Sequence, residues 1–265
     1  MVRSETDVSV ALGRVEWRDL VALRPLEVAR ELLLPLPWLA ASLFFAEIRL
    51  YPVAVICSFV FFLTGLRIVH GACHYALGLP RRVNEWVLFA FSPLMLGSMH
   101  SVQWNHLRHH RYCLAEHDVE AMGARRSAWG AILLGPRFPL CLHRAALTGA
   151  RVRQRRWIWA ELTTNLAPVV IAAIWPCRAS AYHLAVMAIG QCLTAFFAVW
   201  TVHHDCVTAY PAARTIRNSL RNAVTFNMFF HVEHHLFPRV PTPHLPALAR
   251  RLDQAMVHPD WLLVW

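Results

Sequence analysis

Four long apolar stretches dominate the pattern of hydrophobic and polar positions along the chain. A helix needs about 20 mostly apolar residues to cross a bilayer, and each stretch approaches that length. The connections between the first and second stretches and between the third and fourth are short. We therefore predict two hairpins of transmembrane helices, at residues 32–49, 52–69, 157–176 and 182–202.

The remaining segments are more polar. Residues 86–102 are weakly apolar and contain a proline, so we expect them to lie at the membrane interface or to re-enter the membrane without spanning it. Residues 215–230 are predicted to form a helix, and 244–257 a short amphipathic surface helix. Residues 1–31 mix charged and apolar positions without a signal-peptide pattern, and we interpret them as a cytoplasmic arm before one membrane domain, 32–265.

Composition supports this picture. Of 265 residues, 57% are hydrophobic and only 16% are charged, whereas about a quarter of residues are charged in soluble domains. The fold class we predict is an all-α integral membrane protein. Seven scattered cysteines without a C-x-x-C motif make a disulfide framework improbable.

The net charge is +10, and arginine supplies all of the positive charge counted in it because the chain contains no lysine. Ten arginines lie within 103–156, five in the N-terminal arm and six after residue 205, but only one in each short connection. The positive-inside rule then places both termini on the cytoplasmic face. The arginines cluster in the loops between the apolar stretches, which also argues against binding of nucleic acid. We expect a multi-pass protein of a bacterial inner membrane.

Histidines gather in three clusters, each beside an apolar segment: His70-Gly-Ala-Cys-His74, His106-Leu-Arg-His109-His110 and His231-Val-Glu-His234-His235. Helical residues three or four apart share a face, so each cluster can direct its imidazoles at one point. The arginine distribution independently places all three clusters on one side of the membrane. Eight neutral nitrogen ligands exceed the need of one metal, and they predict a dinuclear site held by a cytoplasmic helical cap.

Ligand type alone does not choose the metal, since imidazole binds iron, zinc and copper. Zinc hydrolase chemistry fits less well, because the chain has no H-E-x-x-H motif.

At this point the clusters resemble the three histidine boxes of the integral-membrane fatty acid desaturase and hydroxylase superfamily. The most specific match is the string Thr225–Pro241 (TFNMFFHVEHHLFPRVP), which resembles acyl-lipid and sphingolipid desaturases. The resemblance covers about residues 50 to 255. It implies two iron ions as cofactors and dioxygen as co-substrate. It also implies removal of hydrogen from an unactivated methylene, giving either a double bond or an alcohol.

The resemblance implies metal ligation by the eight box residues His70, His74, His106, His109, His110, His231, His234 and His235. The family usually has one further histidine at the cytoplasmic end of the last span, and His203 and His204 both qualify here. Other histidines outside the boxes, such as His100, are interpreted as structural or surface residues.

Three polar residues are candidates for support of the ligands. Asn227 precedes His231 by four residues on the same predicted helix, where it is either close to the metals or a packing amide. Glu233 either orients an imidazole or lies exposed. Asp118 follows the second box and is expected to pair with a ligand histidine or with an arginine.

Three functions stay open. The leading hypothesis is a desaturase that acts on a fatty acyl chain in a lipid or thioester. The alternative is a hydroxylase or ketolase of the same superfamily, acting on a lipid or a carotenoid. From a different class, the chain could be a catalytically silent membrane protein that binds metal. No haem, flavin or ferredoxin motif is visible, so electrons must come from a separate donor, a ferredoxin or a cytochrome with its reductase.

Overall fold

The computed structural model describes residues 12–206 and 211–255, and helices make up most of these ranges. Short 3₁₀ turns are η1 (Arg18–Leu20), η2 (Glu120–Met122) and η4 (Thr242–His244). The α-helices are α2 (Pro25–Leu33), α3 (Leu36–Glu47), α4 (Tyr51–Cys73), α5 (Arg81–Met95), α6 (Met99–Tyr112), α7 (Ala128–Leu133), α8 (Arg137–Gly149), α9 (Val152–Thr164), α10 (Leu166–Ile174), α11 (Arg178–Thr194), α12 (Thr201–His203), α13 (Ser219–Val224), α14 (His231–Leu236) and α15 (Leu245–Gln254).

Within the described ranges, four continuous helical stretches are long and apolar enough to cross a membrane: Pro25–Glu47, Tyr51–Cys73, Val152–Ile174 and Arg178–His203. The four predicted spans are confirmed, with earlier starts. The first begins at Pro25 and not at residue 32, because proline suits the first turn of a helix. The Glu27 carboxylate also accepts a hydrogen bond from the Arg24 backbone N–H at this end.

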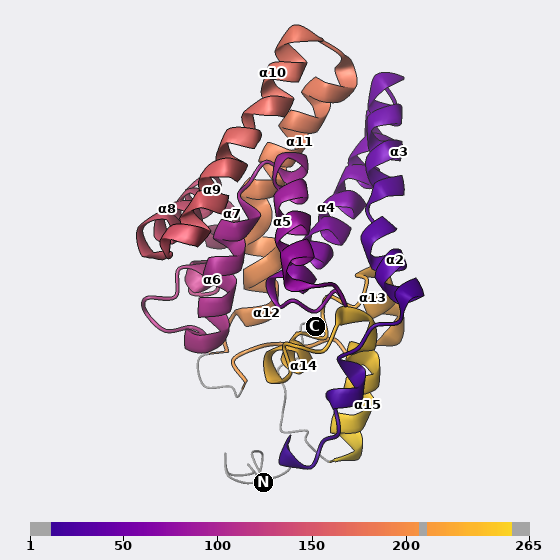
Figure 1. The fold of residues 1–265 in the computed structure, drawn as a ribbon, viewed down its shortest axis with the longest axis vertical. Helices are drawn as coiled ribbons and strands as arrows, with labels where there is room; N and C mark the ends of the chain where they lie inside the picture. Colours follow the sequence, from indigo (N-terminus) through magenta and orange to yellow (C-terminus); the bar gives the residue numbers. More distant parts are fainter. Residues whose placement is uncertain (1–11, 207–210, 256–265) are drawn as a thin grey trace.

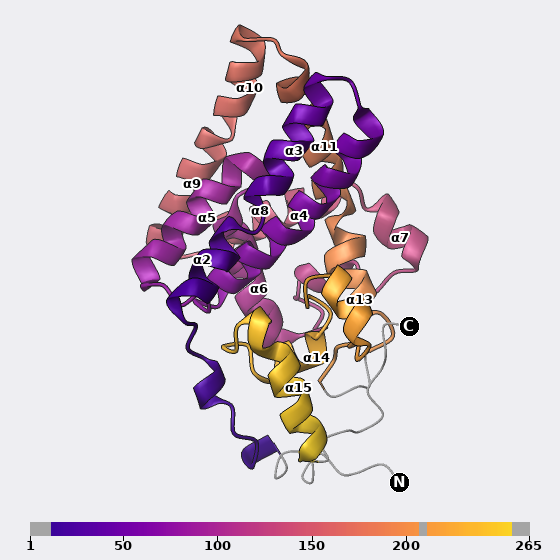
Figure 2. The same ribbon diagram turned by 90° about the vertical axis from the view of Figure 1, so that its right-hand side faces the viewer.

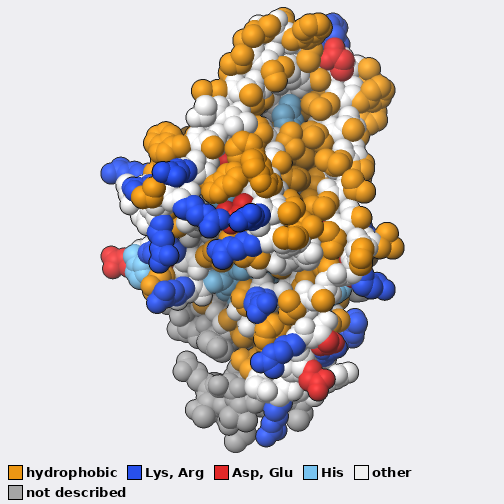
Figure 3. Space-filling model, in the orientation of Figure 1, with side chains coloured by type: hydrophobic (Ala, Val, Ile, Leu, Met, Phe, Trp, Pro, Cys, Tyr) orange, Lys and Arg blue, Asp and Glu red, His pale blue; other side chains and the backbone are white. Residues whose placement is uncertain are grey.

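The spanning helices expose apolar side chains over much of their length. Helix α10 buries none of its residues, and Ile174 is 76% exposed. Figures 1 and 2 show α3, α10 and α11 extending together at one end of the molecule. Figure 3 shows apolar side chains covering the upper part of one face, with a band of basic side chains beneath them. This division is typical of a protein with a lipid-facing zone and a polar end.

Helices α5 and α6 form a hairpin against α4. Leu96 adopts a left-handed conformation that ends α5, and the Ser98 side chain caps α6 by accepting from the Ser101 backbone N–H. Phe61, Ile68 and Leu88 lie fully buried between α4 and α5. Neither α5 nor α6 is among the candidate spans within the described residues, which agrees with the expectation that residues 86–102 do not span the membrane.

The polar end is a cap formed by α13, α14 and α15 together with residues 12–24 (Figures 1 and 2). Leu20 packs against Leu248 and Leu252 of α15, and Arg251 pairs with Asp19 at 2.6 Å. The predicted helix at 244–257 is present as α15, although its last two residues lie outside the described part of the chain.

The prediction of one helix over 215–230 is wrong. Helix α13 covers only Ser219–Val224, because Phe226 and Asn227 both take positive φ angles, 53° and 61°, and turn the chain before α14. Left-handed conformations are uncommon for residues other than glycine, and the sequence gives little warning of them. Arg67 of α4 stabilises this turn, since its guanidinium donates to the Phe226 carbonyl and also pairs with Glu31.

The last spanning helix changes its winding before it ends. Between α11 and α12, residues Ala195–Trp200 form a π-helical turn, η3. Gly123, just after η2, lies so close to this turn that an added Cβ would stand 2.6 Å from the Ala195 carbonyl oxygen. A glycine is therefore required for the loop after the second histidine cluster to pack on η3.

Candidate metal centre

Four helices bring the histidine clusters together at the cap end of the bundle. His70 lies in the last turn of α4 and His74 directly follows that helix, while His106, His109 and His110 share one side of α6. His203 ends α12, and α14 carries His231, His234 and His235. The i,i+3 and i,i+4 spacings explain why each short helix aims its imidazoles in one direction.

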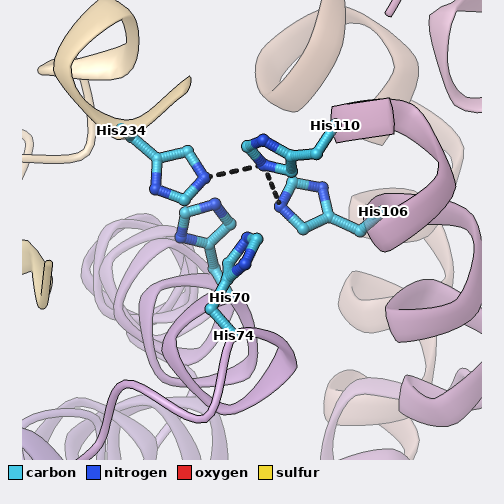
Figure 4. Close-up of side chains that lie close together, drawn as sticks. All are labelled: His70, His74, His106, His110 and His234. Atoms are coloured by element: carbon cyan, nitrogen blue, oxygen red, sulfur yellow. Dashed lines mark hydrogen bonds between the residues drawn. The ribbon is translucent and has the colours of Figure 1, made fainter. Parts of the chain in front are cut away.

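Five of these residues form a first group, consisting of His70, His74, His106, His110 and His234. One nitrogen from each lies within 4.8 Å of all the others. Figure 4 shows the five rings pointing inward, with Nε2 of His110 2.9 Å from Nε2 of His234 and 3.2 Å from Nε2 of His106. Nε2 of His70 and of His74 is buried and has no hydrogen-bond partner among the residues that the structure describes.

Four histidines form a second group beside the first. Nε2 of His203 lies 3.0 Å from Nε2 of His109 and 2.9 Å from Nε2 of His231, and His235 stands 3.2 Å from His231. The Cys113 thiol also borders this group, 3.7 Å from His109. The nine imidazoles thus divide into two neighbouring sets.

Contacts behind the rings fix which nitrogen points inward. Nδ1 of His106 donates to Glu120 at 2.8 Å, Nδ1 of His109 donates to Asp118 at 2.7 Å, and Nδ1 of His203 donates to the Ala212 carbonyl at 2.7 Å. A neutral ring that donates from Nδ1 presents a lone pair at Nε2. Lone pairs facing one another at about 3 Å repel unless a cation lies between them, so this donor set fits bound metal ions.

Burial keeps most of these rings neutral. Loss of solvent lowers the pKa of His110, His234 and His235 below the usual histidine value, and neighbouring imidazoles lower it further. Burial acts in the same direction on His109, but Asp118 and Cys113 oppose it and raise the pKa of His109. A cation at Nε2 of His109 would replace that extra proton.

The structure separates the two adjacent candidates at the end of the last span. His203 joins the second group, whereas the His204 ring stacks on Trp200 at 4.0 Å and Nδ1 of His204 donates to the Trp200 carbonyl. One residue along a helix changes the direction of a side chain by about 100°, so both cannot face the same centre.

The supporting residues differ from expectation in part. Glu233 is fully buried, so the exposed alternative is wrong; its carboxylate accepts from Thr215 Oγ1 and pairs with Arg217. Asn227 does not share a helix with His231, since the chain turns between them. Sequence reasoning missed Glu120, although its place two residues after Asp118 offered a signal.

An apolar cavity reaches the histidines from within the helical bundle. Leu63 and Leu66 of α4, Val102 of α6 and Phe197 of η3 line it, and its wall includes His70, His106, His203 and His231. Such a lining suits an alkyl chain, which would place a methylene against the inward-facing nitrogens.

Comparison with known proteins supports the same assignment. The fatty acid desaturase family model matches residues 47–264. The bovine (Bos taurus) sphingolipid delta(4)-desaturase/C4-monooxygenase is 28% identical over 219 residues, covering 74% of this chain and 65% of its own length. The human protein of the same description is 29% identical over 202 residues, covering 68% of this chain and 59% of its own length.

A chicken (Gallus gallus) sphingolipid delta(4)-desaturase is 27% identical over 201 residues, covering 68% of this chain and 59% of its own length. The chain therefore spans less than two thirds of the length of these relatives. No solved structure matches the chain. The family match nevertheless extends from the end of α3, near the start of the second span, through all three histidine clusters. The chain belongs to the fatty acid desaturase family.

Proposed function

We propose that this membrane oxidoreductase of lipid metabolism is a dioxygen-dependent di-iron enzyme that desaturates an alkyl chain of a sphingolipid. The observation that carries the proposal is the pair of imidazole groups at the wall of an apolar cavity. The sphingolipid class is suggested by the names of the vertebrate relatives.

Two irons held by these groups would supply the reduction of dioxygen that drives removal of hydrogen from the substrate. The overall reaction balances when dioxygen receives two electrons and two protons from outside and two hydrogens from adjacent methylenes. One carbon–carbon double bond and two waters result. The relatives' names also include C4-monooxygenase, so retention of one oxygen as an alcohol is the second candidate.

The chain's own residues perform the binding and the orientation. His70, His74, His106, His110 and His234 would hold one ion, and His109, His203, His231 and His235 the other. Glu120 and Asp118 fix the ring orientation of His106 and His109 from behind. The cavity wall excludes water and holds the alkyl chain in place.

Electrons would come from a separate acidic protein that docks on the exposed arginines at the start of α9, Arg151 and Arg153. Reversing both charges should raise the KM for the donor and weaken its salt dependence. If both stay unchanged, this docking site is wrong.

The arginine distribution supports a cytoplasmic metal centre, and an N-terminal epitope tag should then be protected from protease outside intact cells. The relatives found are vertebrate proteins, and the bacterial inner membrane stays a prediction.

The function is tested by mass spectrometry of lipids from cells that express the wild type or His234→Ala. A wild-type product lighter than its parent by two hydrogens would support desaturation and identify the substrate. A product heavier by one oxygen would favour hydroxylation. If neither product appears when reducing donors are supplied, the enzyme proposal fails.

A further inference from the structure

Glu120 differs from Asp118, the other carboxylate that supports a ligand histidine, because Glu120 is also among the residues that line the apolar cavity. It lies in η2, its side chain is 15% exposed, and its Oε1 accepts from Nδ1 of His106. The second oxygen, Oε2, is buried and accepts no hydrogen bond from the described residues. Asp118 makes a similar contact to His109, but it is not part of the cavity lining.

A buried acceptor without a donor is unfavourable and uncommon in native proteins. Other polar residues of the same wall direct their donors to the backbone: Gln191 donates to the Met95 carbonyl, and Thr194 donates to the Gly190 carbonyl. Oε2 is thus a buried acceptor on a residue of this wall, whose lining apart from the histidines is mostly apolar, and a ligand of the cavity can supply the missing donor.

The loop holds Glu120 in this place. The Asp118 carboxylate accepts from the Leu114 and Ala121 backbone N–H groups, which closes the chain around η2. Gly123 presses against the Ala195 carbonyl of η3 at the other end of the loop. These contacts on both sides hold the backbone of η2, and the hydrogen bond from His106 holds the Glu120 side chain.

The position of Oε2 limits where a substrate donor can be. The same carboxyl group touches the back of His106, whose opposite nitrogen faces the metals. A donor bound to Oε2 then lies on the outer side of the His106 ring, whose inner nitrogen faces the metal centre where the reacting carbon must lie. A plain fatty acyl chain has no donor along its alkyl part, whereas a sphingoid base carries a hydroxyl on C3, next to C4.

We propose that Oε2 of Glu120 accepts a hydrogen bond from a substrate hydroxyl on the carbon next to the reacting carbon. Glu120 is then a specificity-determining residue that selects hydroxylated sphingoid chains over plain alkyl chains. This inference rests on the proposed function and names the substrate feature that the site recognises.

The test compares two substrates, a saturated ceramide and the same lipid without its C3 hydroxyl, in reconstituted protein with reductant. For the wild type, kcat/KM should fall by about tenfold to a hundredfold on the deoxy lipid, because the buried acceptor loses its donor. Glu120→Leu should lower activity on both lipids and bring their ratio close to one. Glu120→Gln keeps an acceptor for His106, and it should lower the ratio with a smaller loss of activity.

Asp118→Asn is the matched control, because it removes the carboxylate acceptor of His109 while the oxygen of the new side-chain amide can still accept from the Ala121 N–H beside Glu120. It should lower activity on both lipids equally and keep the wild-type ratio. The inference is overturned if the wild type uses both lipids equally, or if Glu120→Leu keeps the ratio. It is also overturned if Glu120→Gln loses iron, because Oε2 would then be a metal ligand. Turnover of neither lipid by the wild type would instead count against the proposed function.

Discussion

The metal centre and the surroundings of His100 are both built from buried histidines, but their ring nitrogens face opposite kinds of partner. In the metal centre, Nε2 atoms of different histidines face one another, as in His109 and His203. At His100, Nδ1 lies 2.6 Å from a Glu161 oxygen and Nε2 lies 3.2 Å from a Glu85 oxygen. In the first arrangement ring nitrogens face other ring nitrogens, whereas in the second both ring nitrogens face carboxylate oxygens.

The His100 cluster ties three helices together. His100 comes from α6, Glu85 from α5 and Glu161 from α9, and the ring also stacks on Trp157 at 5.0 Å with an angle of 5°. Burial alone would lower the pKa of His100, but the two carboxylates outweigh it and raise that pKa. The comparison teaches that burial alone does not identify a metal ligand; the partners of both ring nitrogens do.

The largest expected effect comes from His234→Ala, which removes one nitrogen of the first group. Loss of an outer partner of a ligand typically costs about 10–100-fold in affinity or activity, and loss of the ligand itself should cost more. Iron per chain, measured by mass spectrometry of purified protein, should fall together with turnover. His204→Ala is the control and should keep its iron, since that ring stacks on Trp200. Loss of iron from His204→Ala as well would contradict the assignment of His203, and not His204, to the metal centre.

The second-largest effect is expected from Glu161→Ala, which should lower the free energy of unfolding. Removing one partner of a buried ion pair costs about 3–5 kcal/mol, and Glu161 also accepts from Ser98 Oγ at 2.5 Å. In nanodiscs, the unfolding temperature of Glu161→Ala should be markedly below that of the wild type, and that of Glu161→Gln should lie between the two. Glu116→Ala, at an exposed position, should change the free energy of unfolding by less than about 0.5 kcal/mol. Folded Glu161→Ala that has lost its iron would contradict the separation of the two regions.

The smallest effect expected is a dependence of stability on pH. The pKa of His100 is raised in the folded protein. Its contribution to the free energy of unfolding is therefore complete below about pH 6.5, the pKa in the unfolded chain, and is lost as pH rises through the pKa in the folded protein. His100 in turn lowers the pKa of Glu85 to about 2, with help from Tyr75 and Arg153. That contribution is present above about pH 4.5 and is lost as pH falls toward 2.

The quantity to measure is the difference in unfolding temperature between the wild type and His100→Gln across this pH range. It should be largest between about pH 4.5 and 6.5 and should shrink on both sides. A difference that grows steadily with rising pH would mean that His100 is neutral in the folded protein.

The parts of the fold that follow from local sequence were predictable. Hydropathy over about 20 residues locates the spans, and i,i+3 and i,i+4 spacing predicts that each histidine cluster converges. The sequence could not predict that His203 and not His204 belongs to the metal centre, because the direction of each side chain depends on the winding of η3. The helix predicted through Asn227 failed for a related reason, since two left-handed residues in a row leave no hydrophobic pattern.

Contacts between distant elements were also beyond the sequence. His100 and Glu161 are 61 positions apart, and their meeting depends on how α6 packs against α9. The role of Glu120 could not be predicted for the same reason, because its contact with His106 depends on a turn that the Asp118 side chain closes. Polar pairs of this kind become visible only when the helices are placed in space.

The π-helical turn at Ala195–Trp200 has a consequence for insertions and deletions. A π turn closes its hydrogen bonds over one residue more than an α turn, so it takes up an extra residue without rotating the helices before and after it. Deleting one residue within 195–200 should therefore leave His203 in the centre and the iron content unchanged. The same deletion in the middle of α11 should rotate His203 by about 100° and lose iron. The chain can change its length in this turn while the ligand keeps its direction.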